Sequence, residues 1–412
     1  MINHEKLFTA ALQLQDPLYV EKVEFSEQDR ELNIHISFHK GSKFKCSECG
    51  VENLSVHDTV DKVWRHLNFF QYKAFIHFRT PRTICPEHGV RMVQLPWAAP
   101  GSGFTLLFEA LVLQLAQVMP MKQVAKLLNE HDTLLWRILN RYVNQARKEA
   151  DYSEITRVGV DETSSKRRHN YVTLFVDMDK SQVVHVTEGK DSSTITSFKG
   201  MLQSKSIDPK QITDFSADMS IPFRKGLQTE FPWSKVTFDK FHVIKLMNEA
   251  LDEVRRQEQR DEIMLKHSRY IWLSNAKNLK PSQHKKLVTL SQMKLKTARA
   301  YRIKLALQDI YLQANDKYDA MRLLTDWYNW AVRSRLGPIK EYAKTVKSNW
   351  VGILNYFDSR LTNAVLESMN SIVQSARNRA KGYRNVRTFI TMIYLLGGQL
   401  NLEIKSASTH SI

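Results

Sequence analysis

Alternating apolar and polar side chains predict a small sheet near the middle of the chain. Residues 157–162 read Arg-Val-Gly-Val-Asp-Glu, and Val158 and Val160 fall on one face of a strand with a period of two. The runs at 171–177 and 181–186 follow after polar turns. They predict the second and third strands of an antiparallel meander.

Carboxylates end two of the predicted strands. Asp161 stands where the first strand runs out, and Asp218 closes a fourth strand at 212–218. If the first and fourth strands are neighbours, about 4.8 Å apart, the two side chains converge at one edge of the sheet. Two carboxylates this close need a counter-charge, for which a divalent cation is the usual choice. The pattern therefore predicts the beginning of a metal-dependent nuclease site.

The rest of this region alternates between helix and strand. Helical patterns at 194–203 and 221–229 flank the fourth strand, and a fifth strand is predicted at 235–239. A three-stranded meander followed by alternating helices and strands is the order of an RNase H-like fold. Asp239 precedes His242 at the start of a long helical pattern, where the simplest role of Asp239 is an N-cap.

Two cysteine-containing turns stand out in the first hundred residues. Cys46 and Cys49 are separated by two residues, and Cys85 and His88 form a matching pair after an aromatic strand at 69–78. Three thiolates and one imidazole suit tetrahedral zinc, so we expect one structural Zn²⁺ here. The alternative is three unrelated buried cysteines. His57, His66 and His77 are nearby, and His88 is preferred on its spacing.

A helix-turn-helix pattern follows a break rich in Pro and Gly. An apolar helix at 104–119 is stopped near Pro120, and two shorter helices at 121–128 and 133–142 flank a polar turn. The alternative is an ordinary helical hairpin within a linker. In the DNA-binding interpretation the second short helix offers four side chains to a groove: Trp136, Arg137, Asn140 and Arg141.

The charge of the chain favours a polyanionic partner. Its 412 residues include 60 Lys and Arg against 43 Asp and Glu, which gives a net charge of +17. This excess is typical of nucleic-acid-binding proteins, although a solvated basic surface has the same composition. The sequence has no signal-peptide pattern and no run of 18 apolar residues, so we expect a cytoplasmic protein without a membrane segment. Three cysteines, an odd number, argue against a disulfide framework.

Residues 263–308 carry many Lys and Arg but no Asp or Glu. One-signed runs of this kind are usually solvated helix faces. Because nothing anionic offsets the charge, we interpret the run as a phosphate-contacting surface. It includes Lys285, Lys286 and Lys304, and the aromatic residues Tyr270, Trp272 and Tyr301 are interleaved.

A polar stripe is predicted on a helix at 362–371, where Glu367 and Asn370 are three residues apart and can act on the same ligand. Glu367 is either a salt-bridge partner of the basic residues that follow or a third metal ligand beside bound phosphates. Spacing alone does not choose between these roles. The stripe also contains Asn363 and Ser371. The apolar residues predicted to pack inward from this helix are Leu366, Met369, Ile372 and Val373. The basic residues that follow are Arg377, Arg379, Lys381 and Arg384.

Along nearly its whole length the chain resembles the bacterial insertion-sequence transposases of the ISL-three family. The most specific matching segments are 239–242 (Asp-Lys-Phe-His) and 382–385 (Gly-Tyr-Arg-Asn). The cysteine turns, the helix-turn-helix and the segments around the three acidic residues match as well. The resemblance implies a DDE triad of Asp161, Asp218 and Glu367 on an RNase H-like fold, with accessory roles for Asp239, His242 and Asn370.

The resemblance also implies a reaction and its partners. Three such carboxylates hold two Mg²⁺ ions about 3.5–4 Å apart, with Mn²⁺ as an alternative, for phosphodiester hydrolysis and then strand transfer by a DNA 3′-hydroxyl. The implied function is DNA transposition, in which a homodimer binds the inverted-repeat ends of an insertion sequence and joins them to double-stranded target DNA. A zinc-containing DNA-binding regulator without catalysis and an RNase H-like structure-specific nuclease are the alternatives.

These patterns together predict a multidomain α+β protein. The expected parts are a zinc-binding N-terminal module at 1–98 that begins with a hairpin at 18–39, a helix-turn-helix DNA-binding segment at 104–150, an RNase H-like catalytic domain at 155–242 and 356–400, an all-helical insertion at 243–355, and a C-terminal tail at 401–412.

Overall fold

The chain divides into two compact units, each with its own core. A computed structural model describes residues 3–166 and 170–402. One unit comprises Met1–Ala150 with Leu400–Ile412, and the other comprises Asp151–Gln399. The predicted tail at 401–412 lies outside the described residues except for its first two positions.

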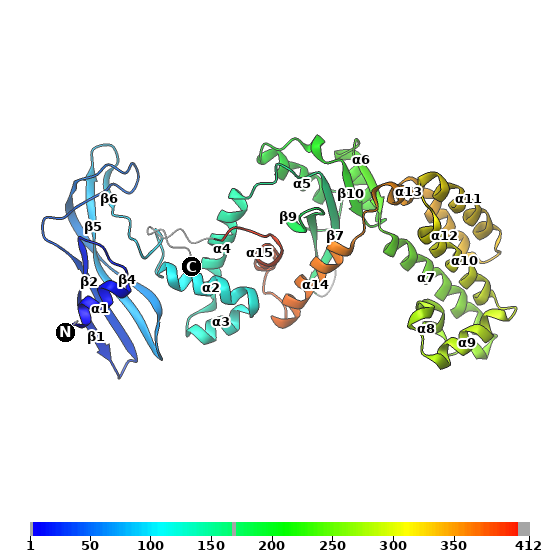
Figure 1. Ribbon diagram of the computed structural model, residues 1–412, viewed down its shortest axis with the longest axis horizontal. Coiled ribbons are helices and arrows are strands. Elements are labelled where there is room, and N and C mark those ends of the chain that lie inside the picture. The colour runs from blue at the N-terminus through cyan, green and yellow to red at the C-terminus, as the bar shows by residue number, and fades with distance from the viewer. Residues whose placement is uncertain (1–2, 167–169, 403–412) are drawn as a thin grey trace. The chain divides into compact units, whose positions relative to one another are not determined.

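The first unit begins with a six-stranded sheet in the order β1-β2-β5-β4-β3, to which β6 adds beside β5 (Figure 1). β1 and β2 form the predicted antiparallel hairpin, and β2 pairs with β5 in parallel. Alternate residues of β2 are buried, as the period of two predicts. The bounds are α1 His4–Ala11, β1 Leu18–Ser26, β2 Glu31–Phe38, β3 Lys43–Phe44, β4 Leu54–Phe69, β5 Tyr72–Cys85 and β6 Gly89–Met92.

The predicted aromatic strand at 69–78 is wrong at its start. β4 ends at Phe69 and β5 begins at Tyr72, so the chain reverses between them. Phe70 takes up a positive φ of 52° in this turn and is 80% exposed. A run of aromatic side chains resembles a buried strand, but only the pairing of two long strands reveals the turn within it.

Three helices complete the first unit and form the predicted helix-turn-helix: α2 Leu106–Val118, α3 Met121–Leu128 and α4 Asp132–Glu149. Asn129, in the left-handed conformation, ends α3, and α4 continues beyond the predicted end at 142. The side chain of Arg65 on β4 is only 4% exposed and donates from Nε to Glu130 Oε1 over 3.0 Å. This buried ion pair connects the first sheet to the turn between α3 and α4.

The second unit contains a five-stranded sheet in the order β11-β10-β7-β8-β9. The first three strands form the predicted antiparallel meander, and β10 and β11 join in parallel beside β7. This is the RNase H-like arrangement that the sequence predicts. The bounds are β7 Arg157–Lys166, β8 Asn170–Asp177, β9 Gln182–Glu188, α5 Ser193–Ser204, η1 Pro209–Gln211, β10 Asp214–Ala217, α6 Ile221–Glu230 and β11 Lys235–Phe238.

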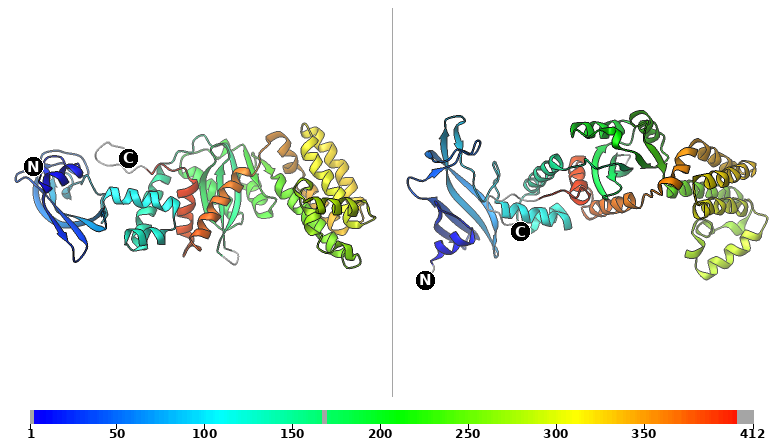
Figure 2. Two further views of the ribbon diagram at one scale, coloured as in Figure 1. Left: turned by 60° about the horizontal axis from the view of Figure 1, so that its bottom comes forward. Right: turned by 45° about the horizontal axis from the view of Figure 1, so that its top comes forward.

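Helices cover both faces of this sheet (Figure 1, Figure 2). On one face Phe198 of α5 stacks on Phe175, with ring centroids 4.5 Å apart, and also contacts Phe215. On the other face Leu366 lies against Gly159 of β7. The helices of this second face are α14 Ala364–Arg379 and α15 Val386–Gly397.

A helical part follows β11 and has a large apolar core to which Phe238 also belongs. Its helices are α7 Lys240–Glu258, η2 Ile263–Leu265, α8 Arg269–Leu273, η3 Ala276–Asn278, α9 Pro281–Gln292, α10 Lys296–Gln313, α11 Lys317–Arg333, α12 Gly337–Ser348 and α13 Trp350–Ser359. The predicted border at 355/356 falls inside α13, which packs on β11 because Gly352 lies against the Phe238 ring.

Part of the predicted phosphate-contacting surface belongs to this core. Trp272 is 0%, Tyr301 5% and Lys304 1% exposed, and Lys304 donates from Nζ to the carbonyl oxygen of Trp272 over 2.8 Å. The interpretation of these three residues as phosphate contacts is therefore wrong. Lys285 and Lys286 on α9 are exposed. None of the helices in the described ranges is long and apolar enough to cross a membrane.

Candidate metal-dependent catalytic site

The two predicted aspartates lie on adjacent parallel strands. Ser216 of β10 is the register partner of Gly159 of β7, and Asp218 and Asp161 each follow two residues later. Side chains two residues apart point to the same face of a strand. Asp161 and Asp218 therefore point to the face that α14 covers.

Helix α14 is fixed to this face by hydrogen bonds along β7. Asn370 donates from Nδ2 to Asp161 Oδ2 over 2.6 Å. One turn later Gln374 donates to Thr163 Oγ1, and Arg377 donates to the carbonyl oxygen of Ser164 over 2.8 Å. The helix therefore follows β7 in a defined register, and Arg377, predicted to contact DNA, supports this register.

Glu367 lies within the polar stripe that faces the aspartates. Four residues before it, Asn363 accepts a hydrogen bond from Ser216 Oγ over 2.6 Å, and three residues after it, Asn370 contacts Asp161. Residues spaced by three or four positions share a helix face, so Glu367 lies above the same edge of the sheet. Its side chain is exposed.

The inward face of α14 agrees with the prediction with one exception. Leu366, Met369 and Val373 are buried, whereas Ile372 is 41% exposed, so its predicted inward position is wrong. The three triad carboxylates are not gathered as closely as metal ligands. In the described ranges, only the cysteine group near the N-terminus brings three or more His, Cys, Asp or Glu ligand atoms within 4.8 Å of one another.

Asp239 and His242 lie beside the two aspartates. Asp239 precedes α7 at the N-cap position but makes no side-chain capping bond, so the expected capping role is wrong. It is 2% exposed, and its Oδ2 lies 3.4 Å from His242 Nδ1. The neighbouring carboxylate of Asp239 raises the pKa of His242, and the charges of Asp161 and Asp218 raise it further. The sequence motif therefore brings an imidazole next to the carboxylates, which favour its positively charged form.

The environment of Asp161 favours its neutral form when no cation is present. Burial raises the pKa of Asp161, and the charge of nearby Asp218 raises it further. Backbone N–H groups hold one oxygen of each aspartate, from Glu162 to Asp161 over 2.8 Å and from Ser220 to Asp218 over 2.9 Å. Asn370 Oδ1 is buried without a hydrogen-bond partner within the described part of the chain. These oxygen atoms fit a hard divalent cation.

Glu162 is a fourth acidic residue of this region that the sequence reading did not select. Burial raises the pKa of Glu162, and the charge of Asp218 raises it further. The adjacent carboxylates of the Asp161-Glu162 pair were the available signal. Alternation along an ideal strand assigns Glu162 to the opposite face, which is why the pattern did not include it.

The four predicted zinc ligands come together at the end of β5. Cys49 Sγ and Cys85 Sγ are 3.6 Å apart, and Cys85 Sγ lies 3.6 Å from His88 Nδ1. Bonds of about 2.3 Å from zinc to each sulfur imply a sulfur–sulfur separation of roughly 3.8 Å in a tetrahedral site. Hydrogen bonding to His88 lowers the pKa of Cys85 to about 6. The group fits one zinc ion with Cys46 as the fourth ligand.

The other nearby histidines have different partners. His66 Nδ1 lies 2.9 Å from Thr105 Oγ1, and burial lowers the pKa of His66 to about 4. His77 Nε2 lies 2.7 Å from Asn33 Oδ1, and His57 lies beside Asp58. The spacing argument thus selected the correct histidine.

The predicted DNA contacts of α4 differ in their surroundings. Arg137 is exposed, whereas Trp136 and Asn140 are half-buried. Arg141 pairs over 2.5 Å with Glu109, which is fully buried, so this arginine holds α4 to α2. The side chains of Arg379, which ends α14, and of Lys381 and Arg384 beyond it are exposed.

Comparisons with known proteins agree with this arrangement. A family model described as a transposase matches residues 158–393, the helix-turn-helix domain of transposase family ISL3 matches 93–143, and the zinc-finger of transposase IS204/IS1001/IS1096/IS1165 matches 42–88. The chain belongs to the ISL3 transposase family. This ISL3 transposase is thus an enzyme of DNA transposition that binds DNA and catalyses its cleavage and strand transfer.

Curated relatives are similar to this ISL3 transposase over almost their full length. The transposase for insertion sequence element IS1557 of Mycobacterium tuberculosis is 27% identical over 433 residues, which cover 96% of each chain. That for IS1001 of Bordetella parapertussis is 26% identical over 389 residues, 91% of this chain and 94% of the relative. Among solved structures, the Drosophila P element transposase strand transfer complex matches with 13% identity and a TM-score of 0.42, covering 73% of this chain and 93% of that one.

Proposed function

We propose that Asp161, Asp218 and Glu367 form the catalytic site with which this transposase cuts the inverted-repeat ends of its insertion sequence and joins them to target DNA. The parallel register of β7 and β10 supports the pairing of the two aspartates. The bond from Asn370 to Asp161 supports Glu367 as the third member, since one helical turn separates Asn370 from Glu367.

Mg²⁺ is the proposed cofactor, as two ions, and Mn²⁺ would also serve. The three carboxylates offer only oxygen, which suits these hard cations. When bound, such ions polarise the phosphodiester and lower the pKa of an attacking water or 3′-hydroxyl. Glu367 is exposed, and binding of the cations would draw its side chain toward the aspartates and complete the site.

The remaining residues of the site orient the carboxylates. The N–H groups of Glu162 and Ser220 and the amide of Asn370 fix the aspartates, which leaves Asp218 Oδ2 directed away from its backbone bond. His242 lies beside Asp239, which favours its positively charged form, and in that form it would offset the negative charge of the carboxylates before cations and DNA bind. The exposed side chains at and beyond the end of α14 would contact DNA phosphates: Arg379, Lys381 and Arg384.

The first unit is proposed to recognise the DNA ends. The zinc group stabilises the end of β5, and the buried pair between Arg65 and Glu130 joins the first sheet to the helix-turn-helix. Arg137 on the exposed side of α4 is then positioned for a groove. Since transposition pairs two ends, we expect two copies of the chain to act as a homodimer.

Cleavage of DNA bearing the element's ends tests this proposal. Loss of a residue that supports a metal ligand lowers activity roughly 10- to 100-fold. We expect a larger drop in the cleavage rate in Mg²⁺ for each variant of a triad residue: Asp161→Ala, Asp218→Ala and Glu367→Ala. Their affinity for the ends should stay within a few-fold of the unmodified protein. Glu341→Ala is the matched control, because its exposed carboxylate pairs only with Lys344 in the same helix. Normal cleavage by any triad variant would remove that residue from the site.

A further inference from the structure

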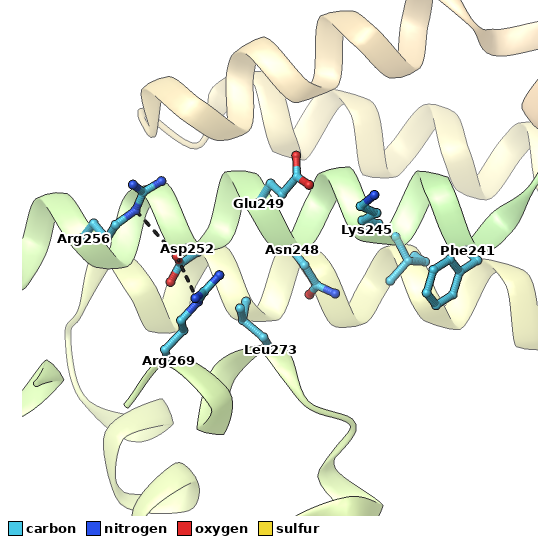
Figure 3. A pocket seen from close by; sticks show the side chains of 9 residues that line it. Phe241, Lys245, Asn248, Glu249, Asp252, Arg256, Arg269 and Leu273 are labelled. Atoms are coloured by element: carbon cyan, nitrogen blue, oxygen red, sulfur yellow. Dashed lines mark ion pairs between the residues drawn. The ribbon is translucent and has the colours of Figure 1, made fainter. Parts of the chain in front are cut away.

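A cavity of about 350 Å³ lies along the first helix of the helical part, between α7 and α8 (Figure 3). Its volume is near the lower end for ligand pockets, so it suits one small ligand rather than a chain of several groups. No residue of the proposed triad lines it. The lining residues are Phe241, Ile244, Lys245, Asn248, Glu249, Asp252, Arg256, Arg269 and Leu273.

One wall of this cavity adjoins the catalytic site. The ring of Phe241 is 59% exposed, although a large apolar ring is usually buried. It meets the imidazole of His242 edge to face, with centroids 6.2 Å apart and planes at 89°. His242 in turn interacts with Asp161 and Asp218. A flat group stacked on Phe241 would therefore sit next to the proposed reaction centre.

The floor of the cavity holds an unsatisfied hydrogen-bond acceptor. Asn248 Oδ1 is buried and has no hydrogen-bond partner within the described ranges. A buried polar atom of this kind costs free energy unless a ligand or water satisfies it. Asn248 follows Phe241 by seven residues, about two turns of the helix, so both lie on one face roughly 10.5 Å apart along the axis. An aromatic wall and an acceptor at this spacing suit a planar base whose N–H groups reach the floor.

The far end of the cavity is lined by charged side chains that pair with one another. Asp252 is only 7% exposed, and three arginines surround it: Arg255 at 2.8 Å, Arg256 at 3.6 Å and Arg269 at 3.4 Å. Arg256 also pairs with Glu253 over 2.6 Å, and Glu249 lines the cavity, so carboxylates offset most of the charge of these guanidinium groups. Figure 3 shows Arg256 and Arg269 at the cavity, each paired with Asp252. The exposed Lys245 lies closer to Phe241. Within the described ranges Lys245 forms no ion pair, and such an ammonium group beside an exposed aromatic ring is a combination that binds single-stranded nucleic acid.

We propose that this cavity receives one unpaired nucleotide of the DNA strand that is processed at the triad. The base stacks on Phe241 and donates a hydrogen bond to Asn248, and Lys245 contacts the phosphate. Extracting this nucleotide from the duplex separates the strands next to the bond that is cut, so that a single backbone enters the site. This inference rests on the proposed function, because it assigns the nucleotide to the strand that the triad cuts.

DNA binding without divalent cations tests the inference separately from catalysis. The full chain in EDTA is titrated with two fluorescent duplexes carrying an element end, one fully paired and one with a single unpaired nucleotide beside the expected cleavage position. Because stacking of one base contributes roughly five- to 100-fold in affinity, the unpaired duplex should bind more tightly by a factor in this range. Equal binding of the two duplexes would overturn the inference.

Variants then locate the effect in the cavity. Phe241→Leu and Asn248→Leu should each reduce the preference for the unpaired duplex and leave the affinity for the paired duplex nearly unchanged. Tyr318→Ala, which removes another exposed ring from the helical part, is the matched control and should keep the preference. A preference that survives in Phe241→Leu would exclude the cavity as its source. Phe241 is largely exposed, so its replacement leaves the core intact, and thermal melting verifies this.

Two further arms separate the remaining outcomes. Asp161→Ala should keep the preference for the unpaired duplex. If the unmodified protein prefers unpaired DNA but never cleaves it, the proposed function is contradicted, whereas the cavity assignment stands. Free deoxynucleoside monophosphates at millimolar concentration should compete only weakly. Tight binding of a free nucleotide together with no preference between the duplexes would instead assign the cavity to a soluble nucleotide and overturn the inference.

Discussion

Replacing Gly159 with alanine should disable catalysis by lifting α14 from the sheet. A Cβ at this position would lie 2.5 Å from Met178 Sδ and 2.9 Å from the Cγ and Cδ2 atoms of Leu366. The methionine tip can move aside, but Leu366 is 1% exposed and immediately precedes Glu367. The clash is therefore relieved by a shift of the helix segment that carries the third carboxylate.

The size of the effect follows from these contacts. Overpacking a core costs about 1–3 kcal/mol, and replacing a strand glycine by alanine returns about 0.5–1 kcal/mol. The net loss of unfolding free energy is then about 0.5–2 kcal/mol. A misplacement of roughly 1 Å at a catalytic group costs about 100-fold in rate. Gly159→Ala should thus lower end cleavage about 100-fold while the protein stays folded and keeps its affinity for DNA.

The assay compares cleavage, binding and chemical denaturation for three variants. Gly200→Ala in α5 is the control, because nothing lies within 4 Å of its added Cβ, and it should be neutral or slightly stabilising. Adding Leu366→Ala to Gly159→Ala should recover part of the lost activity, since it makes room under the helix. Full activity and full stability of Gly159→Ala would refute the close packing of α14 on β7 and the role it gives to Glu367.

Three other predictions concern metal, protonation and the first unit. The purified protein should contain one zinc per chain by elemental analysis, and Cys85→Ser should lose it. Burial raises the pKa of Asp161 above its usual value of 3.8, so its ionised form destabilises the cation-free protein. This destabilisation is absent below pH 3.8 and grows as the pH rises through the pKa that Asp161 has in the folded protein. Asp161→Asn should therefore raise the melting temperature in EDTA at pH 7 but not near pH 3. Arg65→Met should lower the unfolding free energy by about 3–5 kcal/mol because it removes the partner of Glu130, whose side chain is only 14% exposed, against about 0–1 kcal/mol for the exposed Arg79→Met.

The elements that carry the candidate site could be predicted because local patterns encode them. Alternation around Val158 and Val160 identified β7, and the helical spacing around Glu367 identified α14. The adjacency of β7 and β10, on which the pairing of the aspartates depends, followed from the order of strands and helices. The same logic identified the zinc group, whose ligand spacing is constrained by tetrahedral geometry.

Side chains whose role depends on distant partners could not be predicted in this way. Lys304 and Trp272 lie in a basic run, yet the packing of α10 against α8 buries both. Arg141 was assigned to DNA, but the buried Glu109 of α2 holds it. Glu162 belongs to the acidic cluster although alternation assigns it to the opposite face. Charge and period describe one element, whereas burial of a polar group is decided by what packs against it.

Iron-directed cleavage of the protein backbone tests the central claim most directly. Fe²⁺ replaces Mg²⁺ in the presence of end DNA, and ascorbate with peroxide generates hydroxyl radicals that cut the chain next to the bound ion. Mass spectrometry should find cuts near Asp161, Asp218 and Glu367 that disappear with excess Mg²⁺. Cuts at the two aspartates with none near Glu367 would contradict a single site built from three carboxylates.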